Sequence, residues 1–222
     1  MDKRQLIEEI REYNPTAQAQ FATAVTPPDG SRVILFSPNA GSGIGSLAAV
    51  DVFMAPIDAR GQPAVPLLQS PAQKLAAEIS PDGRWLAYQS DESGRHEVFV
   101  RPFPNVDAGR WQISTEGCTR PAWSRKGDEL FYLDGNDQLT AVRCQASGTT
   151  FIPGKPAKVL HGKYAAGSTT RGYDLRSYDV SADGQRFLML KETAGASTSA
   201  PPPTMTVVIN WIEELKSRVP AK

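Results

Sequence analysis

The stretch that decides the fold is Ser80-Pro-Asp-Gly-Arg-Trp-Leu-Ala-Tyr88, in which a tight-turn sequence leads directly into apolar residues. Asp-Gly between two apolar segments is a strong β-hairpin signal, because glycine adopts the positive φ of the turn without steric cost. The Ser or Asp side chain can bond neighbouring backbone N–H groups and hold the turn. The uninterrupted apolar run Trp85 to Tyr88 is typical of a strand buried on both faces.

This pattern occurs four times, beginning at Thr26, Ser80, Ser124 and Ser181. The residues we assign to structural turns are Asp29, Gly30, Asp82, Gly83, Gly127, Asp183 and Gly184, with Lys126 in the place of the third aspartate. Successive glycines of the pattern lie 53, 44 and 57 residues apart. A period of about 40 to 50 residues matches a β-propeller blade. Because the aspartates fall one per repeat, we do not expect them to converge on one metal ion.

Each repeat can be filled in as a series of strands around its turn. We expect first strands at residues 21–25, 75–79, 120–123 and 176–180, and second strands at 33–36, 85–88, 130–133 and 187–190. Third strands are expected at 51–56, 97–103, 138–144 and 205–210, and fourth strands at 65–69, 110–114 and 157–162. The sequence therefore predicts an all-β fold, a β-propeller segment of about four blades with the last one incomplete.

The start of the chain follows a different pattern. Leu6, Ile7, Ile10 and Tyr13 recur at the spacing of one helical face, and Asn14-Pro15 ends the pattern. We therefore expect a short N-terminal helical extension over residues 1–20 and propeller blades over residues 21–220.

Two features resemble a known family. The Ser80 repeat and Glu97-Val-Phe-Val-Arg-Pro-Phe-Pro104 resemble the WD-like repeats of TolB-type β-propellers. The segment from Ser181 to Leu190, followed by a polar loop and Val207-Val-Ile-Asn-Trp-Ile-Glu-Glu-Leu-Lys216, is similar to the end of such propellers in bacterial serine/threonine kinase or DNA-binding receptor proteins. The resemblance covers about residues 25–220. It implies a sensory or protein-interaction module with a periplasmic or other extracytoplasmic location.

The chain departs from that family in length and in its start. A six-bladed propeller needs roughly 270 residues at about 45 per blade, and this chain has 222. The expected N-terminal helix also stands where such propellers have a latch strand. Three interpretations stay open: a truncated gene product, a rare small propeller, and half of an oligomeric ring whose open blade edges pair with another copy.

Composition narrows the function further. The 24 basic and 24 acidic residues balance, which argues against a nucleic-acid partner. No run of 18 apolar residues predicts a membrane span, and no secretory signal is seen, so a cytoplasmic location stays open. The two histidines and two cysteines lack the spacing of a zinc site, and we expect no metal and no cofactor. Whether Cys118 and Cys144 form a disulfide also stays open.

We expect no catalytic residues in this chain. The sequence contains no kinase catalytic loop, no DFG motif and no GxSxG nucleophile motif. The alternative to an interaction module is an accessory propeller, or a remnant of one, from a peptidase or glycan-active enzyme. We expect the tryptophans to lie in the cores between blades rather than in a ligand site. These are Trp85, Trp111, Trp123 and Trp211.

The candidate binding surface is the propeller end opposite the Asp-Gly turns. Long loops at residues 37–50, 165–175 and 192–204 are predicted to emerge there, and loops on a rigid scaffold commonly carry binding sites. This end would be mildly basic and aromatic, suited to an acidic peptide or a glycan. The residues that we assign to partner binding are Arg95, His96, Arg120, Arg171 and Tyr173.

Overall fold

The computed structural model describes residues 27–38, 50–57, 64–160 and 176–189. In these ranges the chain is almost entirely β, and the 3-10 turn η1 (Val106–Ala108) is the only helical element among them. No helix in the described ranges could cross a membrane. The helix expected within residues 1–20 and the strands expected at 21–25 and 205–210 lie outside the described residues.

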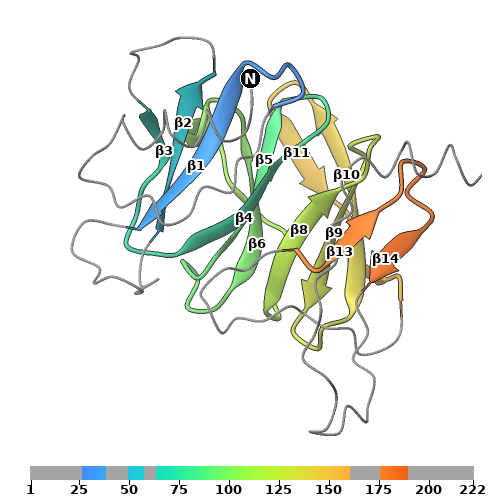
Figure 1. Ribbon diagram of the computed structural model, residues 1–222. Helices are drawn as coiled ribbons and strands as arrows, with labels where there is room; N and C mark the ends of the chain where they lie inside the picture. The colour runs from blue at the N-terminus through green and yellow to red at the C-terminus, as the bar shows by residue number, and fades with distance from the viewer. Residues whose placement is uncertain (1–26, 39–49, 58–63, 161–175, 190–222) are drawn as a thin grey trace, which may run out of the picture. The chain divides into compact units, whose positions relative to one another are not determined.

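The strands form four antiparallel sheets that follow one another in chain order (Figure 1). The first contains β1 (Arg32–Pro38), β2 (Val50–Pro56) and β3 (Val65–Leu68). The second contains β4 (Lys74–Ile79), β5 (Trp85–Ser90), β6 (Glu97–Pro102) and β7 (Trp111–Gln112). The third contains β8 (Cys118–Trp123), β9 (Glu129–Asp134), β10 (Leu139–Ser147), β11 (Thr150–Pro153) and β12 (Ala157–Lys158). The fourth contains β13 (Tyr178–Val180) and β14 (Phe187–Met189).

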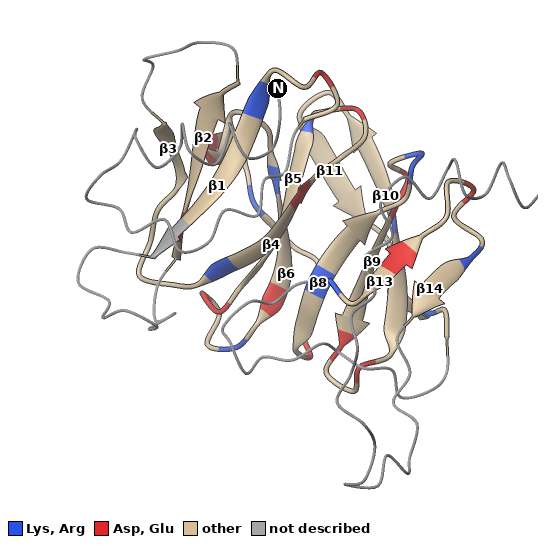
Figure 2. Ribbon diagram, viewed as in Figure 1, with Lys and Arg blue, Asp and Glu red and all other residues tan. Residues whose placement is uncertain are grey.

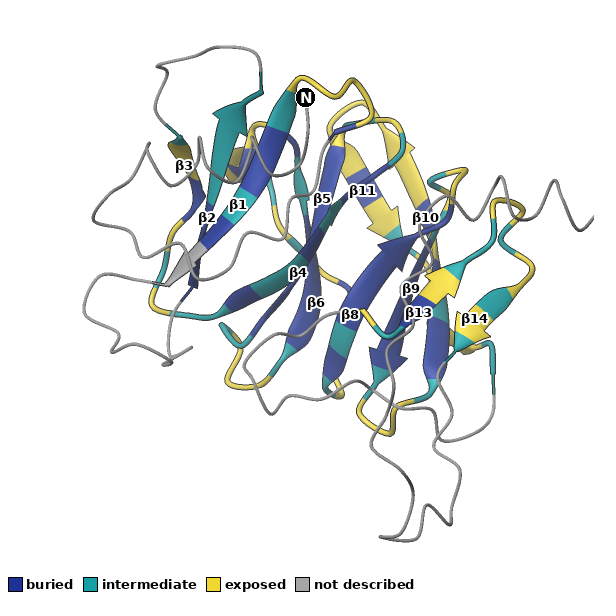
Figure 3. Cartoon of the chain, in the orientation of Figure 1, coloured by how far each residue is buried: buried dark blue, intermediate teal, exposed yellow. Residues whose placement is uncertain are grey.

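Hydrophobic clusters lie between successive sheets. In β5, Leu86 and Tyr88 belong to the cluster with the first sheet, whereas Trp85 and Ala87 belong to the cluster with the third. Residues 130–133 of β9 alternate in the same way between the second and fourth sheets. Both strands are therefore buried on both faces (Figure 3). This arrangement confirms the expected propeller-type stacking and explains the uninterrupted apolar runs.

The first strands of the second and third sheets share an irregularity. The β4–β5 register shifts between Leu75 and Glu78, and the β8–β9 register shifts between Thr119 and Ala122. Each shift contains a non-glycine residue with positive φ, Ala76 at 48° and Arg120 at 56°. Both stand four residues before the serine of their turn. The second and third repeats therefore share a β-bulge in their first strands, and this bulge redirects the side chains of these strands.

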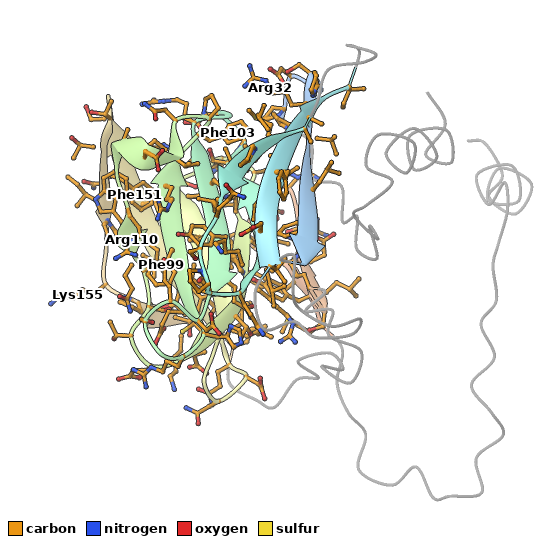
Figure 4. The ribbon with its side chains drawn as sticks, turned by 90° about the vertical axis from the view of Figure 1, so that its left-hand side faces the viewer. Arg32, Phe99, Phe103, Arg110, Phe151 and Lys155 are labelled. Atoms are coloured by element: carbon orange, nitrogen blue, oxygen red, sulfur yellow. The ribbon has the colours of Figure 1, made fainter. Side chains whose placement is uncertain are left out.

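The third sheet contains a hairpin that the sequence analysis did not anticipate. β10 continues to Ser147, turns at Gly148 with φ of 59°, and returns as β11. The hairpin brings Phe151 against aromatic residues of its own and the preceding sheet, with ring centroids 5.0 Å from Trp85, 5.7 Å from Trp111 and 6.2 Å from Trp123. Figure 4 shows the position of Phe151. Of the fourth strand expected at 157–162, the structure shows β12 at Ala157–Lys158, and residues 161–162 lie outside the described residues.

The three tryptophans in the described ranges lie at the interface between the second and third sheets. Trp85 and Trp123 are buried, and the partly buried Trp111 packs against the same cluster. Trp211 lies outside the described residues. Most of the indole surface therefore stabilises the packing of sheets.

Candidate functional site

The four Asp-Gly-type turns share one hydrogen-bonding pattern. In each, the glycine N–H donates to the carbonyl three residues earlier, at 2.8 to 2.9 Å, and the glycine φ lies between 64° and 75°. In the second turn the Ser80 hydroxyl accepts from the Trp85 N–H at 2.9 Å and donates to Asp82 Oδ1 at 2.5 Å. Ser181 makes the same two contacts, with the Arg186 N–H and Asp183. These side chains hold the turns in one conformation.

The third turn replaces the usual aspartate without losing the carboxylate. Lys126 stands in its place, and Asp128, beyond the glycine, accepts from the Ser124 hydroxyl at 2.9 Å. The Glu129 N–H still donates to Ser124 Oγ at 3.1 Å. A carboxylate on the other side of Gly127 therefore takes over the contact with the serine.

Backbone and hydroxyl donors also set the ionisation of two turn aspartates. A hydrogen bond from the Ser31 N–H holds the pKa of Asp29 below its usual 3.8. The Ser181 hydroxyl, together with the Gln185 N–H, lowers the pKa of Asp183. Such donors favour the charged form of a carboxyl group. Hydrogen bonds within their own turns therefore favour the charged form of both aspartates.

Turns of neighbouring repeats come close to one another. A Cβ added at Gly83 would lie 3.7 Å from Pro28 Cδ of the preceding turn, and one at Gly127 would lie 3.6 Å from Pro81 Cδ. The proline of one turn thus lies beside the glycine of the next. The turns of the first three repeats therefore lie side by side at a common edge.

A cavity of about 500 Å³ opens at this turn end. Turn residues Pro28, Pro81 and Arg125 line it, together with the ends of the first strands β4, β8 and β13. Ile79 and Trp123 contribute apolar wall. Residues of all four repeats therefore build one site, and its frame consists of paired strands and hydrogen-bonded turns.

Two acids and one base form a charged group inside the cavity. Arg176 Nη1 lies 2.6 Å from Glu78 Oε2, and Arg176 Nη2 lies 3.4 Å from Asp179 Oδ1. The indole N–H of Trp123 donates to the backbone carbonyl of Glu78 at 3.2 Å. Figure 2 marks acidic positions on β4 and β13. The Arg176–Glu78 pair joins the second repeat to the fourth directly.

Burial controls the ionisation of the cavity acid. It raises the pKa of Glu78 above 4.5, and the nearby Arg176 guanidinium opposes that change. The side chains of Glu78 and Arg176 are 27% and 34% exposed. Because both side chains are partly exposed, a ligand in the cavity can contact the Glu78–Arg176 pair.

Arg125 lies at the rim of the cavity and differs from Arg176 in its interactions. It is exposed, and its guanidinium makes no ion pair or hydrogen bond with any residue in the described ranges. Arg176, by contrast, is shared between two carboxylates. Of the two arginines in the cavity lining, Arg125 is therefore the one available to a ligand anion.

The expected partner-binding residues fall into three groups. Arg95 is exposed and its Nε lies 2.7 Å from Glu97 Oε1. The amide of Gln89 brings His96 and Arg120 together: its nitrogen lies 3.2 Å from His96 Nδ1, and its oxygen accepts from the Arg120 N–H at 3.1 Å. Arg171 and Tyr173 lie outside the described residues.

Arg120 differs from the expectation that it presents its charge at the surface. It is only 2% exposed, because the β8 bulge sets it among neighbouring strands. Its carbonyl accepts a hydrogen bond from the Tyr178 hydroxyl at 2.7 Å. In this position Arg120 helps to join the third and fourth sheets.

Lys74 and Glu97 are buried charged residues that the sequence analysis did not anticipate. Lys74, 3% exposed, donates to the carbonyls of Val50, Ser70 and Ala72 at 2.8 to 3.2 Å. Glu97, 1% exposed, accepts from the Ser114 hydroxyl and the Gly117 N–H at 2.5 and 2.9 Å, besides its pairing with Arg95. Buried charges are tolerated when they are paired and hydrogen-bonded. Both tie loops to strands.

The cysteines are free and buried. Cys118 begins β8, and Cys144 lies within β10. Burial raises the pKa of each thiol to about 12, so both remain protonated near neutral pH. Across the described ranges, no three His, Cys, Asp or Glu side chains gather as a metal site would require.

Comparison with known proteins gives partial matches. No family model matches the chain. A 72-residue stretch, 31% of the chain, is 38% identical to dipeptidyl aminopeptidase BI of Pseudoxanthomonas mexicana and covers 10% of that protein.

Similar solved structures include a putative TolB from Agrobacterium tumefaciens, with 16% identity over 63% of this chain and 51% of that one and a TM-score of 0.44. They also include a puromycin-hydrolyzing peptidase of Mycobacterium tuberculosis, with 15% identity over 78% of this chain and 29% of that one and a TM-score of 0.49. The chain spans a tenth of the curated relative and about half or less of these two structures.

Proposed function

We propose that this chain is a non-catalytic protein-interaction module of the β-propeller type, with its ligand site in the cavity at the turn end. The observation that supports the proposal is the cavity itself. Its volume of about 500 Å³ falls within the usual range for ligand sites, roughly 300 to 1,000 Å³. Its lining combines apolar wall with a few charged groups, which suits a ligand that must be both bound and oriented.

The frame of the cavity is held in place before any ligand enters. The Ser-Asp hydrogen bonds fix the turns, and Trp123 is held by its bond to the carbonyl of Glu78. In a preformed site, ordering of the side chains on ligand binding costs little free energy. The loop end near Arg95 and His96 remains a second surface for a protein partner in this proposal.

Selection of peptides on the full chain tests the proposal. A random heptapeptide display library is selected on immobilised protein, and the enriched peptides are measured by fluorescence anisotropy. The variant Pro28→Trp adds bulk at the exposed rim, and Ile152→Trp adds the same bulk at an exposed residue that does not line the cavity. We expect Pro28→Trp to abolish binding and Ile152→Trp to preserve it. Equal binding by both variants would show that the peptides do not bind in the cavity.

The second candidate is the accessory propeller, or a remnant of one, from a peptidase. The 38% identity to dipeptidyl aminopeptidase BI over 72 residues favours it. Both candidates predict that the purified chain alone does not hydrolyse dipeptidyl p-nitroanilides. Turnover that is blocked by a serine-hydrolase inhibitor would contradict a non-catalytic role for this chain.

A sensory role, an extracytoplasmic location and pairing through an open blade edge complete the proposal. They follow from the sequence resemblance and from the incomplete last blade that the sequence predicts. Light scattering coupled to size exclusion tests the pairing. A discrete species at twice 24.1 kDa supports it, and a monomer at all concentrations contradicts it.

A further inference from the structure

We infer that the cavity recognises a linear peptide that places a carboxylate beside an apolar or aromatic side chain, with Arg125 as the residue that receives the carboxylate. The inference rests on the proposed function and names the ligand class of the same site.

The third turn differs in charge from its equivalents in the same chain. At the two positions before the glycine, the other turns have Pro28-Asp29, Pro81-Asp82 and Ala182-Asp183, whereas the third has Arg125-Lys126. The third turn therefore carries two cations where the others carry one small apolar residue and one acid. Of these two cations, Arg125 lines the cavity and Lys126 does not. The departure from the repeat thus places an unpaired positive charge at the rim.

The charged residues inside the cavity, Arg176, Glu78 and Asp179, limit which other groups the ligand can carry. Arg176 already contacts Glu78 and Asp179, so it offers little to a second anion. The carboxylates can instead accept hydrogen bonds from the N–H groups of a peptide backbone. They also disfavour ligands with several negative charges, such as phosphates, because like charges repel strongly in a partly buried site. One carboxylate at Arg125 matches this arrangement.

The wall supplies the apolar part of recognition. Ile79, Ala122 and Trp123 line the cavity with the small part of their surface that sheet packing leaves uncovered, and the indole hydrogen bond of Trp123 to the Glu78 carbonyl fixes its orientation. Pro28 and Pro81 add rigid apolar surface at the mouth. An apolar or aromatic ligand side chain would bury its surface against this wall while its neighbouring carboxylate stays near the rim. Bidentate hydrogen bonding makes arginine well suited to hold that carboxylate.

The experiment compares two charge reversals in the same turn. The heptapeptide library is selected on the full wild-type chain, and one enriched peptide and its Glu→Gln or Asp→Asn analogue are measured against Arg125→Glu and Lys126→Glu. We expect enriched sequences with an acid beside an apolar or aromatic residue. Arg125→Glu and the amide analogue should each weaken binding at least tenfold, and Lys126→Glu less than threefold. Both residues are exposed, and circular dichroism confirms that the variants fold.

The outcomes separate the inference from the proposed function. Enriched peptides without an acid, or peptides unaffected by Arg125→Glu but blocked by Pro28→Trp, would overturn the ligand class and leave the cavity as the binding site. Displacement of the peptide by inorganic phosphate at constant ionic strength would indicate a general anion site and also overturn the inference. A library that yields no binder, or binders unaffected by Pro28→Trp, would overturn both.

Discussion

Replacing Phe151 by alanine tests the packing of the β10–β11 hairpin on the preceding sheet. Phe151 is 2% exposed and its ring contacts three indoles, with centroid distances of 5.0 to 6.2 Å. Truncation of a buried phenylalanine to alanine costs about 3–5 kcal/mol. The contacts come from two sheets, so the cavity that remains cannot close by a shift of the hairpin alone. We therefore expect the upper half of that range, a large fraction of the about 5–15 kcal/mol typical of whole proteins.

The assay is urea unfolding of the full chain followed by tryptophan fluorescence and, separately, by far-UV circular dichroism. Ile152→Ala is the matched control, because Ile152 is the next residue of β11 and is 55% exposed. Exposed substitutions usually change stability by within about 0.5 kcal/mol. A loss below about 1 kcal/mol for Phe151→Ala, or equal losses for the two variants, would refute the packing of Phe151 in the core between the second and third sheets.

Three further predictions concern ionisation and backbone geometry. Burial places the folded pKa of Glu78 above 4.5, so its protonation favours the folded state at low pH and this contribution is lost as pH rises through the raised pKa. Glu78→Gln should therefore gain stability relative to wild type between pH 4 and pH 7 in urea midpoints, and an unchanged difference would contradict the direction of the shift. Cys118 and Cys144, with thiol pKa values of about 12, should not react with Ellman's reagent at pH 8 until the chain unfolds; rapid labelling of the native protein would refute their burial. Gly127 has φ of 75° and room for a Cβ, so Gly127→Ala should cost about 1–2 kcal/mol through backbone strain alone. Gly127→Asn should cost less, and a reversed order in thermal melts would argue against this conformation.

The turns and central strands are predictable because their signals are local. Asp-Gly, the preceding serine and the following apolar run all lie within ten residues, and the structure places a strand after each turn. Even the third turn, where Lys126 breaks the pattern, keeps the serine and glycine that define it. The uninterrupted apolar runs of the second and third repeats correctly indicated burial on both faces, whereas Leu188 in the fourth run is 74% exposed.

The features that sequence analysis missed depend on contacts between distant residues. The β11 strand had a local signal, Gly148 between Ser147 and the β-branched Thr149, but its stability depends on Trp85 in another repeat. Arg120 reads as an ordinary exposed cation, and only the bulge in β8 explains its burial. The cavity combines strand ends from three repeats, so no short stretch of sequence identifies it.

The placement of hydrophobic clusters between sheets has a consequence for synthesis of the chain. Trp85 reaches its native surroundings only when Phe151, 66 residues later, has been added. At about 5–20 residues per second, that interval is roughly 3 to 13 s on the ribosome. During it, the second sheet can form its hydrogen bonds while one apolar face stays uncovered. The nascent chain is therefore most exposed to aggregation while the third repeat is being made, and codon usage in that repeat should affect the yield of folded protein.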